Sequence, residues 1–188
     1  MNPSMKLLLG LYLGLLLGCS SIQVSQDYLP DTEFYNLKTY QWQSEKQKPT
    51  GNERIDNPLL DKRIRTAIDH SLFEMGYQKI ETGRPDFYVS YIYSLRSKIE
   101  SRDTGTSFGF GIGKVGRYGS IGINSGQEIN EYDQANLLID LTNSKTKELI
   151  WRGNATRRMA DHYQPEKITE IVNEMVSKIL AQFPPLPN

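Results

Sequence analysis

A strict alternation of apolar and polar side chains at residues 86–96 constrains the fold more than any other feature of the sequence. Period-two alternation is typical of a β-strand that buries one face and exposes the other. The predicted buried face consists of Phe87, Val89, Tyr91, Tyr93 and Leu95. A strand with such a face needs neighbouring strands and a second layer that covers its apolar side chains.

Three more segments have the composition of neighbouring strands. Residues 132–143 and 148–158 both alternate, and the polar residues 144–147 between them predict a turn, so the two segments predict a β-hairpin. Residues 34–43 are rich in aromatic side chains and predict a further strand. The predicted inward-facing residues of these segments are Tyr40, Trp42, Leu137, Ile139, Leu141, Leu149, Trp151, Gly153 and Ala155.

Two segments carry the signals of amphipathic helices. Asn57 followed by Pro58 is a helix-start signal, and Gly76 suits the position just after a helix, which predicts a helix over 58–75. A second helical stripe begins at Pro165 and ends before a Pro-Pro pair. The sequence thus predicts two helices that each bury one face.

The order of these elements predicts the fold class. It reads strand, helix, strand, Gly-rich insert, strand, strand, helix. This order favours an α+β fold, a two-layer sandwich in which a mostly antiparallel sheet of about four or five strands carries two helices on one face. A chain of this size buries roughly 70% of its unfolded surface, so its core needs no disulfide or metal.

The first eighteen residues differ from the rest of the chain. Residues 7–17, LLLGLYLGLLL, are uncharged and follow Lys6. As a helix this run would be about 16 Å long at roughly 1.5 Å per residue, which is too short for an ordinary membrane span. Its proportions are those of the apolar core of a signal peptide.

The end of this run resembles the lipobox of bacterial lipoproteins. The motif is LLGC, with Gly18 before Cys19 and Ser20 after it. The resemblance implies that the chain is cut between Gly18 and Cys19, that the thiol of Cys19 receives a diacylglyceryl group, and that the new amine is acylated. The alternatives are a plain secretory signal with a chance cysteine and a buried structural cysteine.

These features divide the chain into three parts. We expect a lipoprotein signal peptide over 1–18, a lipidated tether over 19–33 with at most a short strand at 22–25, and a single α+β domain over 34–188. Ser20 resembles the second residue of lipoproteins that are sorted to the outer membrane. The resemblance implies a domain that faces the periplasm of a Gram-negative envelope.

Further motifs resemble the DUF4136 family, bacterial lipoproteins of unknown function. The motifs are KTYQW at 38–42, RPDFYV at 84–89, LIDL at 138–141, LIWRG at 149–153 and FPP at 183–185. Their order and spacing carry the resemblance over about residues 22–185. The family supplies no catalytic residues that can be transferred to this chain.

Composition excludes several classes of protein. The chain has 22 basic and 22 acidic residues among 188, so its net charge gives no reason to bind nucleic acid. Its single cysteine excludes an internal disulfide, a Cys-rich zinc site and an iron–sulfur cluster.

Residues 104–126 form a Gly-rich insert. GIGKVG at 111–116 fits the dinucleotide pattern GxGxxG, but the residues that follow cannot open a helix, so we expect no nucleotide binding. Phe108, Phe110 and Ile112 alternate with glycines and predict an extended hairpin with one bare face. The insert is interpreted either as a docking or membrane-touching edge or as a surface segment without a partner.

Side chains with catalytic or metal-binding chemistry are sparse. His70 and His162 lack the spacing of zinc ligands, and we expect both on the surface. Glu128, Glu131 and Asp133 are close in sequence, but calcium needs six to eight oxygen ligands, so a solvated strand edge is the better interpretation. No GxSxG elbow supports a hydrolase. We expect no cofactor, no metal and no enzymatic activity.

Basic and aromatic residues leave two further alternatives open. Arg152, Asn154 and Thr156 share one predicted strand face, and Arg157 and Arg158 follow them. This face is either a contact for anionic envelope components or, as the pattern favours, the solvated side of an amphipathic strand. The many tyrosines and tryptophans are predicted to lie mostly in the core, with some available to line a groove.

The sequence therefore predicts a cell-envelope lipoprotein that acts as a non-catalytic binding or scaffolding module. Its acyl chains on Cys19 would anchor it in the membrane, and other envelope proteins or peptidoglycan are its expected partners. The alternatives are a hydrolase of envelope polymer or lipid with a dispersed site, and a lipid-binding module with an apolar cavity between sheet and helices.

Overall fold

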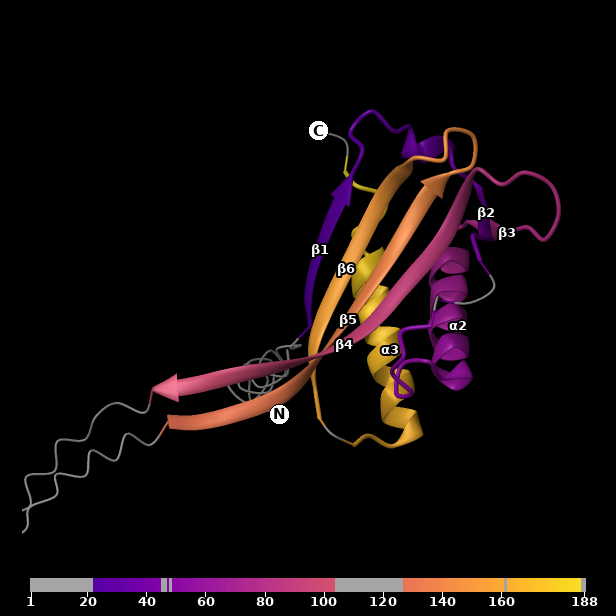
Figure 1. Ribbon diagram of the computed structural model, residues 1–188. Helices are drawn as coiled ribbons and strands as arrows, with labels where there is room; N and C mark the ends of the chain where they lie inside the picture. The colour runs from indigo at the N-terminus through magenta and orange to yellow at the C-terminus, as the bar shows by residue number, and fades with distance from the viewer. Residues whose placement is uncertain (1–21, 45–46, 48, 104–126, 161, 187–188) are drawn as a thin grey trace, which may run out of the picture.

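The protein folds into two layers, an open sheet and a pair of helices that cover one of its faces (Figure 1). The computed structural model describes residues 22–44, 47, 49–103, 127–160 and 162–186. Gly18, Cys19 and the insert at 104–126 lie outside this part of the chain. Within it, no helix is both long and apolar enough to cross a bilayer.

The sheet contains six strands in the order β1-β6-β5-β4-β2-β3. The strands are β1 (Gln23–Tyr28), β2 (Thr39–Trp42), β3 (Gln78–Lys79), β4 (Phe87–Asp103), β5 (Gln127–Asn143) and β6 (Leu149–Met159). Strands β1, β6, β5 and β4 pair antiparallel, whereas β2 pairs in parallel with both β4 and β3. The expected α+β class is confirmed.

The strand count exceeds the four or five that were expected, for two reasons. The edge strand β1 lies inside the segment expected to act as a tether, because its polar sequence pairs with β6 through backbone hydrogen bonds that need no apolar pattern. The edge strand β3 has only two residues, too few to produce an alternating pattern. A 3-10 turn, η2 (Phe34–Asn36), occupies the start of the segment predicted as the strand 34–43.

The helices begin where the sequence predicted. Helix α2 (Pro58–Glu74) starts after Asn57, whose side-chain oxygen accepts a hydrogen bond from the backbone N–H of Leu59. Gly76 follows it with φ +89°, a left-handed conformation that a side chain would strain. Helix α3 (Pro165–Leu180) buries a stripe against the sheet, and Phe183 packs after its end.

The core lies between the helices and one face of β4, β5 and β6. Trp151 on β6 is fully buried and lies against the Phe183 ring, with the ring centroids 5.2 Å apart. The predicted inward position of Leu149 is wrong, because an irregularity in the β5–β6 register between Leu141 and Thr142 turns Ile150 inward instead. Ile150 is 2% exposed and Leu149 is 43% exposed.

Gly153 sets how closely α3 approaches the sheet. A Cβ at this position would overlap the side chains of Ile179 on α3 and Trp151 on the same strand. We expect Gly153→Ala to lower the free energy of unfolding by about 1–3 kcal/mol, because the added methyl group forces the two layers apart. Urea unfolding followed by circular dichroism measures this change. Thr156→Ala, on the opposite face of β6, is the matched control, and equal stabilities of the two variants would contradict the prediction.

Candidate functional site

Two carboxylates of α2 tie the helix to the sheet. Asp69 accepts hydrogen bonds at Oδ1 from the Tyr40 hydroxyl at 2.8 Å and from Trp42 Nε1 at 3.0 Å. Its Oδ2 accepts one from Lys79 Nζ at 3.3 Å. Asp61, about two helical turns earlier on the same side of α2, accepts one from the Tyr91 hydroxyl. Two carboxylates of α2 therefore orient three aromatic side chains of the sheet.

Arg65 joins these contacts into one network. Its Nε lies 3.0 Å from Asp61 Oδ1, and its guanidinium carbon lies 4.3 Å from the centre of the Trp42 ring. The ring of Trp42 also packs edge-on against Tyr91, with the centroids 6.2 Å apart. The side chains at this junction of helix and sheet hold each other in place.

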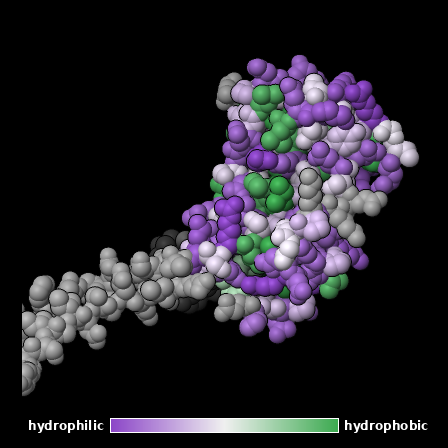
Figure 2. All heavy atoms as spheres, viewed as in Figure 1, coloured by the Kyte–Doolittle hydropathy of each residue, from purple (hydrophilic) through white to green (hydrophobic). Residues whose placement is uncertain are grey.

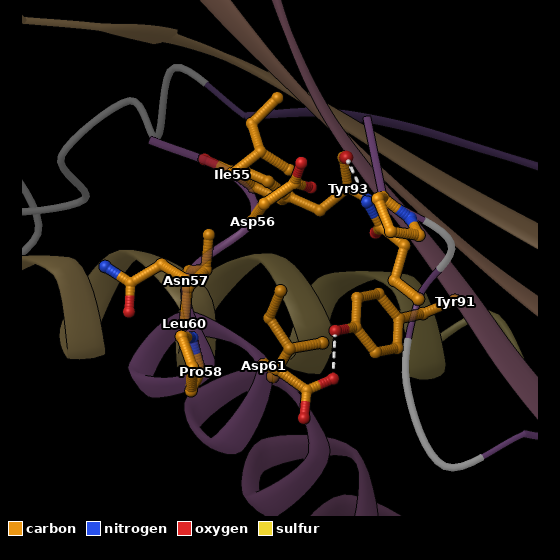
Figure 3. Close-up of a pocket in the computed structure, with 11 residues that line it drawn as sticks. Ile55, Asp56, Asn57, Pro58, Leu60, Asp61, Tyr91 and Tyr93 are labelled. Atoms are coloured by element: carbon orange, nitrogen blue, oxygen red, sulfur yellow. Dashed lines mark hydrogen bonds between the residues drawn. The ribbon is translucent and has the colours of Figure 1, made fainter. Parts of the chain in front are cut away.

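A pocket of about 220 Å³ lies beside this network, between β4, the start of α2 and the loop before the helix (Figure 3). We call it the α2 pocket. It is lined by Gln47, Pro49, Ile55, Asp56, Asn57, Pro58, Leu60, Asp61, Ile64, Tyr91 and Tyr93. The lining is mainly apolar, and Figure 3 shows the Tyr91 hydroxyl directed at the carboxylate of Asp61 on one wall.

The loop that forms the outer wall of the α2 pocket is attached to the sheet by side-chain hydrogen bonds to the backbone of β4. The Gln47 side chain accepts a hydrogen bond from the Tyr93 backbone N–H and donates one to the Tyr93 carbonyl oxygen. Gln47 therefore satisfies the edge of β4 where β2 has ended. Asp56 closes the loop, since its carboxylate accepts hydrogen bonds from the backbone N–H groups of Thr50 and Gly51, which lower its pKa.

Two polar groups inside the α2 pocket are available to a ligand. The carboxylate of Asp61 has a side-chain exposure of 25%. Tyr93 also lines the pocket, and burial raises the pKa of its hydroxyl to about 12. The pocket therefore offers a carboxylate acceptor and a neutral hydroxyl beside apolar walls.

The size of the α2 pocket decides what it can hold. A cavity of about 150 Å³ accommodates a benzene molecule, and sites for drug-sized ligands occupy about 300–1,000 Å³. At about 220 Å³ the α2 pocket suits one aromatic or branched aliphatic group, not a whole lipid.

The residues singled out from the sequence lie elsewhere. His70 is exposed on α2 and lies 3.3 Å from Glu74, and His162 is exposed before α3. Asp133 binds Arg54 at 2.5 Å and Ser97 at 3.0 Å. Within the described part of the chain, no group of three His, Cys, Asp or Glu side chains is arranged to hold a metal ion.

The basic residues of β6 have local partners. Arg152 forms two hydrogen bonds with the carboxylate of Asp140, its neighbour on β5, at 2.7 and 2.6 Å. Arg157 pairs with Glu174 on α3 at 2.7 Å. Arg152, Asn154 and Thr156 do share the face of the sheet that the helices leave open, opposite the buried Trp151, Gly153 and Ala155.

The α2 pocket was not predicted from the sequence. The available signal was the spacing of Asp61, Arg65 and Asp69, which places two carboxylates and a guanidinium on one side of the helix, next to its buried apolar residues. Their aromatic partners belong to β2 and β4, so the network required knowledge of the helix–sheet contact.

Exposed apolar side chains do not mark another site on the visible surface. Figure 2 shows them as small separate groups among polar residues. The most exposed are Leu186, Phe73, Tyr35 and Leu59, which come from different elements of the chain. Single exposed apolar residues of this kind are common on soluble domains.

Comparison with known families identifies the chain. A family model described as "Domain of unknown function (DUF4136)" matches residues 24–185. The chain belongs to the DUF4136 family. No curated protein matches it.

A solved structure shares the fold at low sequence identity, and two others are similar to a lesser degree. A PDZ domain protein from Parabacteroides distasonis is 14% identical with a TM-score of 0.54, and the alignment covers 97% of this chain and 41% of that one. The chain therefore spans less than half the length of that protein. Two structures of the PelC dodecamer from Paraburkholderia phytofirmans are 11% and 12% identical with TM-scores of 0.48 and 0.45. Each alignment covers 85% of this DUF4136 chain and 95% of PelC.

The network predicts a loss of stability at alkaline pH. Burial and the hydrogen bonds to Asp69 and Asp61 raise the pKa values of Tyr40 and Tyr91 above the ordinary value of 10.0. A raised pKa in the folded state contributes stability that is present below the unfolded pKa and is lost above it. We expect the free energy of unfolding to fall as pH rises above about 10.

Urea unfolding at a series of alkaline pH values measures this dependence. The double variant Tyr40→Phe/Tyr91→Phe has no phenol to ionise at these positions, so its stability should fall less steeply over the same range. Parallel curves for the two proteins would contradict the assignment.

Proposed function

We propose that this DUF4136 protein is a cell-envelope lipoprotein whose domain binds a partner without catalysing a reaction. The anchor would be the acylated Cys19, with the domain in the periplasm and the acyl chains in the outer membrane. Support comes from the lipobox-like sequence before the only cysteine. Each buried CH₂ group contributes roughly 0.8 kcal/mol, so several acyl chains would give lasting attachment.

The observation that carries the binding role is the α2 pocket. It is partly open, mainly apolar and of side-chain size, and it has the Asp61 carboxylate on its wall. These properties suit an apolar side chain of a protein partner, with a cationic or hydrogen-bond-donating group next to it. Anchoring would raise the local concentration of the pocket for partners in the envelope.

The volume of the α2 pocket also bears on the alternative that the protein binds a lipid. The lipid-binding alternative places an apolar cavity between the sheet and the helices, and the α2 pocket found there is smaller than a site for a whole lipid, so the side-chain role of this pocket has better support. For the hydrolase alternative, the described residues supply no supporting contact, since both histidines lie outside this pocket.

Lipidation predicts a specific change in mass and fractionation. The native protein should begin at Cys19 and carry fatty acyl groups there, which intact-mass spectrometry measures. Cys19→Ala should abolish both the cleavage and the added mass, because the thiol is the acceptor of the diacylglyceryl group. A Cys19→Ala protein that is still processed and still fractionates with the outer membrane would contradict the anchor.

Filling the α2 pocket should remove partner binding. Ile55→Trp adds an indole where the partner side chain would sit, whereas Leu59→Trp adds one at a position that is 62% exposed and outside the pocket. Crosslinking in intact cells, followed by mass spectrometry, identifies the proteins captured by each variant. We expect the wild-type partner to persist with Leu59→Trp and to be lost with Ile55→Trp.

Thermal unfolding of both variants separates loss of binding from loss of fold. If a folded Ile55→Trp protein captures the same partners in the same amounts as the wild type, the α2 pocket is not the binding site.

A further inference from the structure

One edge of β4 loses its neighbouring strand soon after β4 begins. Strand β2 pairs with β4 only from Phe87 to Val89, whereas β5 pairs with β4 along its whole length to Asp103. In the part of the chain that the structure describes, no strand follows β2 along this edge. Outward-pointing backbone N–H and C=O groups on such an edge are a template for the addition of another strand.

A side chain stands in for a strand at Tyr93. The Gln47 amide oxygen accepts a hydrogen bond from the Tyr93 N–H at 2.6 Å, and its amide nitrogen donates one to the Tyr93 carbonyl oxygen at 3.2 Å. A side-chain amide carries the same kinds of donor and acceptor as a peptide group, so Gln47 imitates a paired strand at this residue. The backbone groups of Leu95 and Ser97 point in the same direction as those of Tyr93, because this direction repeats every second residue of a strand.

The α2 pocket lies beside this edge (Figure 3). Tyr91 and Tyr93 of β4 line it on the side of the sheet, and Gln47 lines it as well. Residues that lie opposite one another on paired strands point to the same face of a sheet. A strand that replaced the Gln47 amide on Tyr93 would therefore direct every second side chain toward the helix layer. The pocket volume of about 220 Å³ accommodates one such side chain.

Strand β2 shows which side chains fit between this edge and α2. Its residues that face the helix, Tyr40 and Trp42, are aromatic, and they donate hydrogen bonds to Asp69 at 2.8 and 3.0 Å. Beyond the end of β2, the carboxylate that α2 presents is that of Asp61, on the wall of the pocket. A strand that continued β2 along β4 would meet Asp61 as β2 meets Asp69.

Asp61 can accept a further hydrogen bond. Its Oδ1 receives the Tyr91 hydroxyl and Arg65 Nε, and the same Nε lies 3.2 Å from its Oδ2. A carboxylate offers about four acceptor positions, so these two donors leave room for another. Its side chain is 25% exposed, beside apolar walls. An aromatic ring that carries an O–H or N–H group suits both the apolar walls and the carboxylate.

We propose that the edge of β4 from Tyr93 to Ser97 binds an extended segment of a partner protein as an added strand. The segment runs parallel to β4, as β2 does, and replaces the Gln47 amide on Tyr93. One of its side chains, a tyrosine or a tryptophan, occupies the α2 pocket and donates a hydrogen bond to Asp61. This inference rests on the proposed binding role of the α2 pocket and states the form of the partner. In such strand addition, backbone hydrogen bonds give affinity and pockets for alternate side chains give specificity.

The sequence of β2 supplies a probe. A fluorescein-labelled peptide KTYQWQ, the sequence of residues 38–43, is titrated with the full-length protein in detergent solution, and fluorescence anisotropy measures its binding. In β2 itself, the backbone groups of Thr39 and Gln43 bond to β4 or to the residue before it, whereas the side chains of Tyr40 and Trp42 face α2. We expect saturable binding of this peptide, with slower hydrogen exchange at the amide of Leu95.

Two N-methylated peptides separate strand addition from simple filling of the pocket. Methyl groups on the backbone nitrogens of the two glutamines remove donors that would face β4, whereas methyl groups on those of the tyrosine and the tryptophan change the opposite edge. We expect the first peptide to bind at least about tenfold more weakly, because two backbone hydrogen bonds are lost. The second should bind as the unmodified peptide does. Equal affinities of the two methylated peptides would overturn parallel pairing with β4.

Removing the competing amide should strengthen binding. In Gln47→Ala the peptide no longer has to displace a side chain from Tyr93, so we expect its dissociation constant to fall by about fivefold. If Gln47 acted only as a wall of the pocket, its truncation would weaken binding instead. The matched control, Gln43→Ala, shortens an exposed glutamine outside the α2 pocket and should leave the affinity unchanged. An affinity of Gln47→Ala equal to or below that of the wild type overturns the displacement of Gln47.

A peptide without donors tests the contact with Asp61. The peptide KTLQLQ keeps apolar side chains at the two aromatic positions, but these cannot donate a hydrogen bond. We expect it to bind at least about tenfold more weakly than KTYQWQ, since a hydrogen bond to a charged acceptor is lost. Equal binding of the two peptides overturns the role of Asp61.

The outcomes distinguish this inference from the proposed function. If a folded Ile55→Trp protein captures the wild-type partners unchanged, the binding role of the α2 pocket fails, and strand addition fails with it. If Ile55→Trp abolishes capture but KTYQWQ does not bind the wild type or Gln47→Ala, strand addition alone is overturned.

Discussion

The packing of α2 against the sheet depends on hydrogen bonds from aromatic side chains to helix carboxylates. Asp69 receives the Tyr40 hydroxyl and the Trp42 indole, and Asp61 receives the Tyr91 hydroxyl. A carboxylate that is partly removed from water must be compensated by such donors, and an aromatic side chain brings its donor on an apolar ring. The contacts therefore fix the rotation of α2 and still allow its apolar stripe to be buried.

This arrangement also explains why the α2 pocket is open. Ile64 and Leu60 of the helix are buried, and the Gln47 side chain attaches the loop before α2 to β4 through two hydrogen bonds. The loop stays in place without filling the space beneath it. The Asp61 carboxylate consequently has two roles: it accepts hydrogen bonds from Tyr91 and Arg65, and it lines the open α2 pocket.

The two faces of the sheet differ in what covers them. Helices cover one face, and Tyr91 and Tyr93 of β4 line the α2 pocket there. The other face, which carries Arg152, Asn154 and Thr156 of β6, is left open by the helices.

The local elements could be predicted from the sequence because their causes are local. Alternation at residues 86–96 and the Asn57-Pro58 helix start depend on neighbouring residues, and both predicted the element correctly. The edge strand β1 was predicted only as a short strand within a tether, because backbone pairing with β6 does not need an apolar pattern. The two-residue strand β3 left no pattern to detect.

Contacts between distant segments were decided by the tertiary structure. The inward position of Ile150 instead of Leu149 depends on an irregularity in the pairing of two strands. The α2 pocket unites residues from a loop, a helix and a strand, and the row from Gln23 to Ser94 unites four strands. The sequence by itself determined the helices, the alternating strands, the membership of the family and the candidate anchor at Cys19, because propensity, periodicity and short motifs act over a few residues. The pocket arises only when strand register and helix rotation bring distant side chains together.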